Sequence, residues 1–107
     1  MANTFKNYAE KDVTANQVIH TVAAATQTTI IGMTVANVTE TAQTANVAIV
    51  TAGHANSYSI VKNATVPAGG ALVPVGGDQK VVLEAGDSLT THCSGKCDVI
   101  LSVLEIT

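Results

Sequence analysis

The chain has 107 residues, of which 12% are charged and 3% are aromatic, and its formal net charge is −3 at pH 7. This length fits one domain. The basic residues are scattered lysines without the clustering that phosphate contacts need, so we expect no nucleic-acid partner. Apolar runs are shorter than the about 20 residues of a membrane helix, and the N-terminus lacks a signal-peptide pattern. We therefore expect a product of the cytoplasm with no membrane partner.

Hydrophobic residues make up 47% of the chain and are mainly alanine, valine and isoleucine. Branched side chains of this kind favour pleated sheet. The surface must then consist of threonine, serine, asparagine and alanine, which carry no charge. A weakly charged surface protects poorly against association, so we expect a protein that packs against copies of itself or a partner.

The first half of the chain shows five short stretches with strand character, separated by polar or small residues. Residues 1–12 form an edge strand or an extended arm, residues 10–16 a loop, and residues 23–27 a connection. The expected strands are Asn3–Ala9, Gln17–Val22, Thr28–Val38, Ala45–Thr51 and Ser57–Lys62. Ala45–Thr51 is expected to pair with the strand before it, and a loop tip is expected at residues 52–56. Alternation places Val18 and His20 on one side of their strand, and it places Ile31 on the same side as Met33 and Val35.

The second half begins with Ala71–Val75, where Pro74 cannot donate a ladder hydrogen bond and so predicts an edge strand. A turn is predicted at residues 76–78. Lys80–Leu83 is a short strand, followed by a turn at residues 84–87 in which Gly86 supplies a positive φ and the acidic side chains cap the turn.

The C-terminal part predicts a hairpin between Leu89–Cys93 and Cys97–Ile106, closed by the turn at residues 94–96. If Cys93 lies opposite Cys97, one side of the hairpin is mostly apolar and the other mostly polar, as a half-buried antiparallel sheet requires. The expected pairs are Leu89 with Leu101, Thr91 with Val99, Ser88 with Ser102, Thr90 with Ile100, and His92 with Asp98.

About eight short strands separated by glycine, asparagine and proline turns predict an all-β fold. We expect one antiparallel, jelly-roll-like β-sandwich that spans residues 1–107.

The pair Cys93 and Cys97 is the sharpest local chemical feature. Placed opposite each other, the two α-carbons would lie within disulfide range. Their oxidation would close a short loop and stabilise the fold by about 2 kcal/mol. The alternative is two reduced cysteines, as in other cytosolic proteins. We predict a disulfide. The favoured form joins the two cysteines of one chain, and the alternative is a bond between chains.

Metal and catalytic sites have weaker sequence support. A zinc site would combine His92 with the two cysteines, but strand alternation points His92 to the opposite side, and His20 and His54 show no predictable convergence with them. The predicted pair of His92 and Asp98 has no evident nucleophile beside it. We expect no enzyme activity, no metal and no cofactor.

Two long stretches, NATVPAGGALVPVGGDQKVVLEAGDSLTT and DVILSVLEIT, resemble a group of small virion proteins of tailed bacteriophages. The segments MANTFKN and IIGMTVANVT resemble the same group. The resemblance implies an all-β structural protein of the virion, such as a capsid decoration (cement) protein that binds the major capsid protein. In that group the turn around Cys93 and Cys97 is usually rich in serine and alanine, so the cysteines would be a local addition.

Three functions follow as hypotheses. The first is a capsid decoration protein, and the second is a neck, collar or tail component of the virion. The third is a carbohydrate-binding sandwich, which the small number of aromatic residues disfavours. We expect a homo-oligomer, with a trimer favoured because capsid lattices offer threefold positions.

Overall fold

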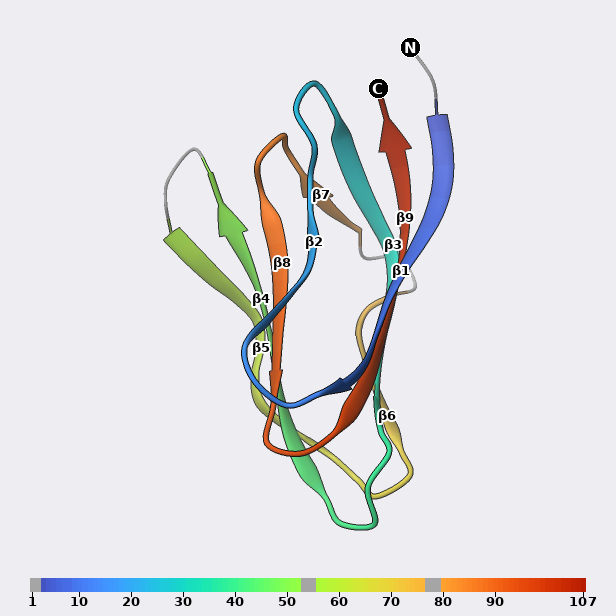
Figure 1. The fold of residues 1–107 in the computed structure, drawn as a ribbon, viewed down its shortest axis with the longest axis vertical. Helices are drawn as coiled ribbons and strands as arrows, with labels where there is room; N and C mark the ends of the chain where they lie inside the picture. Colours follow the sequence, from blue (N-terminus) through green and yellow to red (C-terminus); the bar gives the residue numbers. More distant parts are fainter. Residues whose placement is uncertain (1–2, 53–55, 77–79) are drawn as a thin grey trace.

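The computed structural model describes residues 3–52, 56–76 and 80–107 of the chain. Within these ranges the backbone forms nine strands in two antiparallel sheets that pack face to face (Figure 1). The strands are β1 (Asn3–Val13), β2 (Gln17–Thr21), β3 (Gln27–Asn37), β4 (Gln43–Thr51), β5 (Asn56–Val66), β6 (Ala71–Val75), β7 (Val81–Leu83), β8 (Ser88–Cys93) and β9 (Cys97–Ile106).

Sheet A has the strand order β1-β9-β3-β6, with the short strand β7 also paired to β3. Sheet B has the order β2-β8-β4-β5. The chain passes repeatedly from one sheet to the other, as in a jelly roll, where two Greek keys are wrapped into a sandwich. The predicted all-β, antiparallel, jelly-roll-like sandwich is confirmed.

The predicted hairpin between the last two strands is wrong. β8 pairs with β2 and β4 in sheet B, whereas β9 pairs with β1 and β3 in sheet A. The turn at residues 94–96 therefore carries the chain across the sandwich (Figure 1). The predicted division into a buried and an outward side is nevertheless correct, because both strands present alternate residues to the same core whether or not they pair.

Two further predictions of pairing and orientation are corrected. β4 pairs with β5 and β8 and does not pair with β3, because the chain changes sheet between β3 and β4. In β3 the register shifts between Ile30 and Gly32, so Ile30 is buried and Ile31 is only half-buried, although the sequence pattern placed Ile31 inward. A bulge adds one residue to one strand and so reverses the alternation beyond it.

The predicted edge positions are confirmed at both sides of sheet A. β1 is an edge strand paired to β9, and it extends to Val13 through residues that were expected to form a loop. β6, with Pro74, lies at the other edge. The predicted loop tip at residues 52–56 and turn at 76–78 lie largely outside the described residues, as does His54.

The core fills the space between the sheets with small and medium apolar side chains. Its largest fully buried members are Ile30, Leu83, Leu89 and Leu101, and valines supply most of the remainder. Branched residues of this size interdigitate between two pleated surfaces about 10 Å apart. Among the described residues no helix is long and apolar enough to span a membrane.

Candidate functional site

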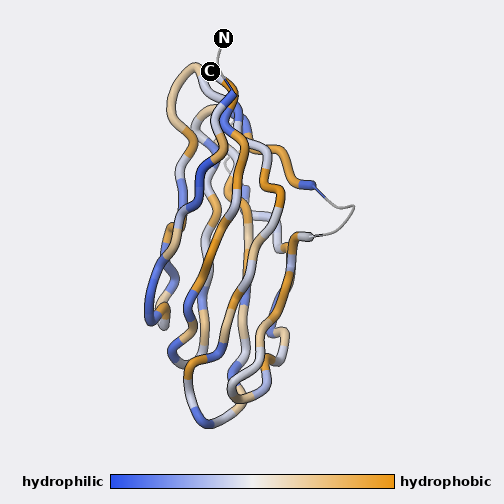
Figure 2. Tube along the Cα trace, turned by 90° about the vertical axis from the view of Figure 1, so that its right-hand side faces the viewer, coloured by the Kyte–Doolittle hydropathy of each residue, from blue (hydrophilic) through white to orange (hydrophobic). Residues whose placement is uncertain are grey.

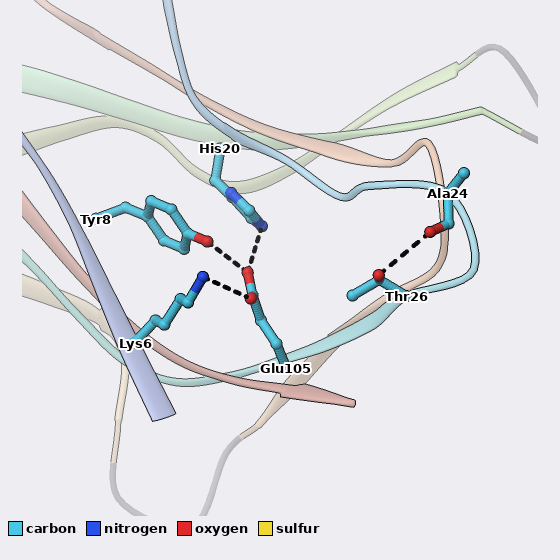
Figure 3. Close-up of polar contacts among 6 residues, drawn as sticks. All are labelled: Lys6, Tyr8, His20, Ala24, Thr26 and Glu105. Carbon is cyan, nitrogen blue, oxygen red and sulfur yellow. Dashed lines mark hydrogen bonds and ion pairs between the residues drawn. The ribbon is translucent and has the colours of Figure 1, made fainter. Parts of the chain in front are cut away.

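A group of four polar side chains, here called the polar cluster, lies where β1 of sheet A approaches β2 of sheet B (Figure 3). Its members are Lys6 and Tyr8 on β1, His20 on β2 and Glu105 on β9. The side chains of His20 and Glu105 are only 8% and 13% exposed. Sequence reasoning missed this cluster because its residues are far apart in the chain and come together only through the strand order.

Glu105 is the centre of the polar cluster. The Tyr8 hydroxyl donates a hydrogen bond to Glu105 Oε2, and Lys6 Nζ lies 3.5 Å from Glu105 Oε1. The ring of His20 stacks on Tyr8 with a centroid distance of 4.1 Å, and its Nε2 lies 3.8 Å from Glu105 Oε2. The cluster thus links three strands and both sheets at the edge of the sandwich.

A β-bulge explains how His20 reaches this position. The register between β2 and β8 shifts between Val18 and His20, so Ile19 and His20 are both turned away from solvent while Val18 is exposed. Regular alternation would have placed Val18 and His20 on one side, as the sequence pattern indicated.

The groups of the polar cluster perturb one another's ionisation. The hydrogen bond to Glu105 raises the pKa of Tyr8 to about 12, with smaller contributions from burial and from the charge of Glu105. The same bond from Tyr8 lowers the pKa of Glu105, against the effect of burial. Burial lowers the pKa of His20, and the nearby Glu105 charge opposes this only in part. At neutral pH the cluster therefore contains an ionised Glu105, a neutral His20 and a protonated Tyr8.

The arrangement suits a structural clamp better than a catalytic base. The carboxylate of Glu105 is already engaged by Tyr8 and Lys6, and its two partners lie on the neighbouring edge strand. His20 Nε2 is buried without a hydrogen-bond partner. Such a group costs stability, and the ring that carries it packs against Tyr8.

The cysteine pair lies near the opposite end of β9 from Glu105. Cys93 ends β8, Cys97 begins β9, and both are fully buried in the core. Both are free thiols in this structure. Burial raises the pKa of the Cys93 thiol to about 12, and the adjacent Cys97 thiol adds to the effect through a hydrogen bond.

The structure thus brings the predicted disulfide partners together, and the disulfide itself stays a prediction. Burial of both residues favours a bond within one chain, because a sulfur atom of another copy would have to enter the core to reach either thiol. The turn between the two cysteines is fixed to β4 by a hydrogen bond of 3.0 Å from the Ser94 amide to the Thr44 carbonyl.

The predicted pair of His92 and Asp98 does not form. His92 is exposed and lies opposite Asn46 on β4. Asp98 faces the other side of the molecule, where it accepts a hydrogen bond from the Asp12 amide and lies 3.9 Å from Lys11 Nζ. The pair fails for the same reason as the hairpin, because the two strands belong to different sheets. Within the described ranges, no three His, Cys, Asp or Glu side chains gather as a metal site requires.

The predicted turn cap is confirmed for one of its two acidic residues. Asp87 is buried and accepts hydrogen bonds from the amides of Glu84 and Ala52, each at 2.9 Å. Gly86 has the expected positive φ of 88°. Glu84 takes part in this turn through its backbone carbonyl, which accepts a hydrogen bond from the Asp87 amide, and Glu84 is exposed to solvent.

Asn37 is a second buried polar residue, and its side chain is fully engaged in hydrogen bonds. Its Nδ2 donates to the carbonyls of Thr41 and Val66, at 2.8 and 3.0 Å. Its Oδ1 accepts from the amide and the hydroxyl of Thr39, at 2.9 and 2.7 Å. One side chain therefore connects the end of β3 to the turn that follows and to the end of β5.

The outward surface of sheet A, here called the outer face, carries large apolar side chains. Phe5, Val82 and Ile100 are 74%, 61% and 51% exposed. Figure 2 views the molecule from this side, and apolar and polar positions alternate along its strands. Because direct partners in an antiparallel ladder point to the same side of the sheet, the register defines the face. Its apolar members are Phe5, Val82, Ile100, Leu104 and Ile106.

Comparison with known proteins shows a likeness in fold. No protein-family model and no curated protein matches the chain. The fold is similar to a solved structure described as "Bacillus endospore appendages form a novel family of disulfide-linked pili", with a TM-score of 0.58 and 8% sequence identity. The match covers 99% of this chain and 87% of the other. The TM-score indicates a shared fold, and at 8% identity the likeness shows the fold alone.

Proposed function

We propose that this chain is a non-enzymatic structural protein of a bacteriophage virion. In its simplest form it is a decoration protein that binds the outside of the major capsid protein and stabilises the shell. The observation that carries the proposal is the apolar outer face of sheet A, since an exposed apolar patch of this kind marks a surface that another subunit of an assembly covers. The stretches at residues 63–91 and 98–107 resemble small virion proteins, and this resemblance is the reason for proposing a virion as the assembly.

The architecture is consistent with a mechanical role. Nearly every strand is held by ladder hydrogen bonds on one or both sides, and the two sheets are joined by a core, a polar cluster and a buried asparagine. The polar groups of Glu105, Asn37 and Asp87 make contacts that connect strands. A shell component needs such rigidity because it resists internal pressure with no energy input after assembly.

A second candidate is a subunit of a protein filament. The fold likeness to a protein of disulfide-linked pili favours it, because the same sandwich there belongs to an appendage. Both candidates require self-association or attachment to a lattice, and both are structural. A neck, collar or tail position is a third arrangement of the same kind.

A carbohydrate-binding role has less support. Sugar sites usually stack the ligand on exposed aromatic rings. The exposed aromatic residues Phe5 and Tyr58 lie on different sheets, β1 in sheet A and β5 in sheet B. They therefore do not form one platform for a sugar ring.

Quantitative mass spectrometry of purified particles tests the proposal. We expect the chain in every particle at hundreds of copies, in fixed proportion to the major capsid protein. A few copies, enough for one ring, would replace decoration with a neck or tail position. Absence from the particle, or filaments formed by the purified chain alone, would overturn the virion proposal.

A further inference from the structure

The two outward surfaces of the sandwich differ in chemistry. On sheet B the outward positions of β8 and their partners on β4 are mainly hydroxyl, amide and imidazole groups, including Ser88, Thr90, His92 and Asn46. On sheet A the corresponding positions carry the apolar residues of the outer face. The outer face therefore carries more large exposed apolar side chains than the outward side of β2, β8 and β4, where Val18 is the one with large exposure.

The outer face has an uncharged centre. From the C-terminal end of β9 inward, each outward residue has one partner on β1 and one on β3. None of these positions carries a charged side chain; they are Ile106, Leu104, Ser102 and Ile100 on β9, Asn3, Phe5, Asn7 and Ala9 on β1, and Gln27, Thr29, Gly32 and Thr34 on β3. Beyond Ile100, the next outward residue of β9 is Asp98, which lies 3.9 Å from Lys11.

The size of the outer face matches what a stable contact requires. β9 has 10 residues, which at about 3.3 Å per residue gives a length of roughly 33 Å. Four neighbouring strands spaced by about 4.8 Å give a width of roughly 20 Å. The footprint is therefore on the order of 600 Å², comparable with the about 800 Å² that each partner contributes to a standard protein interface.

We propose that the outer face of sheet A binds the outer face of a second copy of this chain. A twofold contact brings each surface against itself, so any charge in its centre would meet a like charge. An uncharged face of about the required area can close on itself without that repulsion. Phe5, Leu104, Val82 and Ile100 are the residues that this contact would remove from water.

This inference rests on the self-association in the proposed function and specifies its geometry. A face-to-face contact between identical surfaces is isologous and gives a dimer. It differs in that respect from the trimer that the sequence favoured. The remaining surfaces, including the polar side of sheet B, would then be available to the lattice or shell.

The test is sedimentation velocity of the purified full chain from low micromolar to millimolar concentration. We expect the wild type to form a dimer. In the variant Ile100→Lys two buried ammonium groups would oppose each other, so the dissociation constant should rise by at least about tenfold. Val82→Lys, on another strand of the same face, should act in the same direction. Circular dichroism confirms that each variant is folded.

Val18→Lys is the matched control. Val18 is 52% exposed, close to the 51% of Ile100, but lies on β2 of sheet B. This variant should keep the wild-type dissociation constant. A wild type that stays monomeric, or a dimer that Ile100→Lys and Val82→Lys leave intact, would overturn the inference. A wild-type trimer would overturn it too. None of these results bears on whether the chain occurs in particles, so the proposed function is tested separately.

Discussion

Cys93 and Cys97 come from different sheets and meet in the core, where the thiol of one contacts the thiol of the other. The sandwich thus has a site at which a single covalent bond would join sheet A to sheet B. Such a bond would reduce the number of conformations accessible to the unfolded chain, and it would also hold the two sheets together.

The cysteine pair is expected to be oxidised in the mature particle. The closed loop is short, so the disulfide should stabilise each chain by about 2 kcal/mol. Peptide mapping under non-reducing, denaturing conditions should recover Cys93 linked to Cys97. Reductant should lower the unfolding temperature of the wild type and leave a Cys93→Ala/Cys97→Ala variant unchanged. Free thiols at both positions in purified particles would contradict the prediction, and a ladder of higher masses would place the bond between chains.

Oxidation of this pair should be slow at neutral pH. The thiolate is the reacting form, and burial raises the pKa of the Cys93 thiol to about 12. The native reduced protein should therefore resist alkylation and react faster as the pH rises toward that value. The alkylation rate in urea is the reference, because unfolding removes the protection. Equal rates with and without urea would show that the pair is accessible in the native fold.

Tyr8 should ionise only near pH 12. In a Tyr58→Phe background Tyr8 is the single tyrosine, so the phenolate absorbance reports on it alone. Its pKa is raised from 10.0 to about 12, so its hydrogen bond stabilises the fold fully below pH 10 and is lost between pH 10 and 12. Adding Glu105→Gln removes the charged acceptor and should return the transition toward 10. A transition near 10 without that change would show that the bond is absent.

Mild acid should destabilise the sandwich through His20. Burial lowers the pKa of His20 from 6.5, so the neutral form stabilises the fold above 6.5 and this contribution is lost as the pH falls through the lowered value. Glu105, Tyr8 and Lys6 face the imidazole, and Glu105 stays ionised in this range because its own pKa is lowered. The urea concentration at the unfolding midpoint should therefore decrease when the pH is lowered from about 7 to about 5.

The variant His20→Phe keeps the stacked ring and removes the ionisable nitrogen, so this pH dependence should become flatter. His92→Gln is the control, because His92 is exposed on β8 and its removal should leave the dependence intact. A wild-type midpoint that does not change over this range would contradict the assignment.

Asn37→Ala should be among the more damaging polar substitutions. It leaves the buried carbonyl of Val66 and the amide of Thr39 without the partners they have now. Unsatisfied buried groups cost about 1–3 kcal/mol each, so we expect a loss of roughly 2–4 kcal/mol in the free energy of unfolding. Urea denaturation measures it. Asn7→Ala, at an exposed position on β1, should change stability by less than about 0.5 kcal/mol, and equal losses would refute the role of Asn37.

The alternation of apolar and polar residues along β8 and β9 predicted correctly which side chains are buried. It could not predict which strands pair, because alternation reports only the direction of a side chain relative to the core. A tight turn between two such strands closes a hairpin in one sheet or crosses between two sheets with the same pattern. Long-range pairing of β9 with β1 and β3 decided between them.

By itself the sequence determined the fold class, the edge position of β6 through Pro74, the turn at Gly86 and the buried positions of Cys93 and Cys97. These depend on local stereochemistry and on the twofold period of a strand. Only the tertiary structure decided the strand order, the bulges that turn Ile30 and His20 inward, and the meeting of Tyr8 with Glu105. Such features arise from contacts between residues distant in the chain, and the free energy of those contacts has no local signature in the sequence.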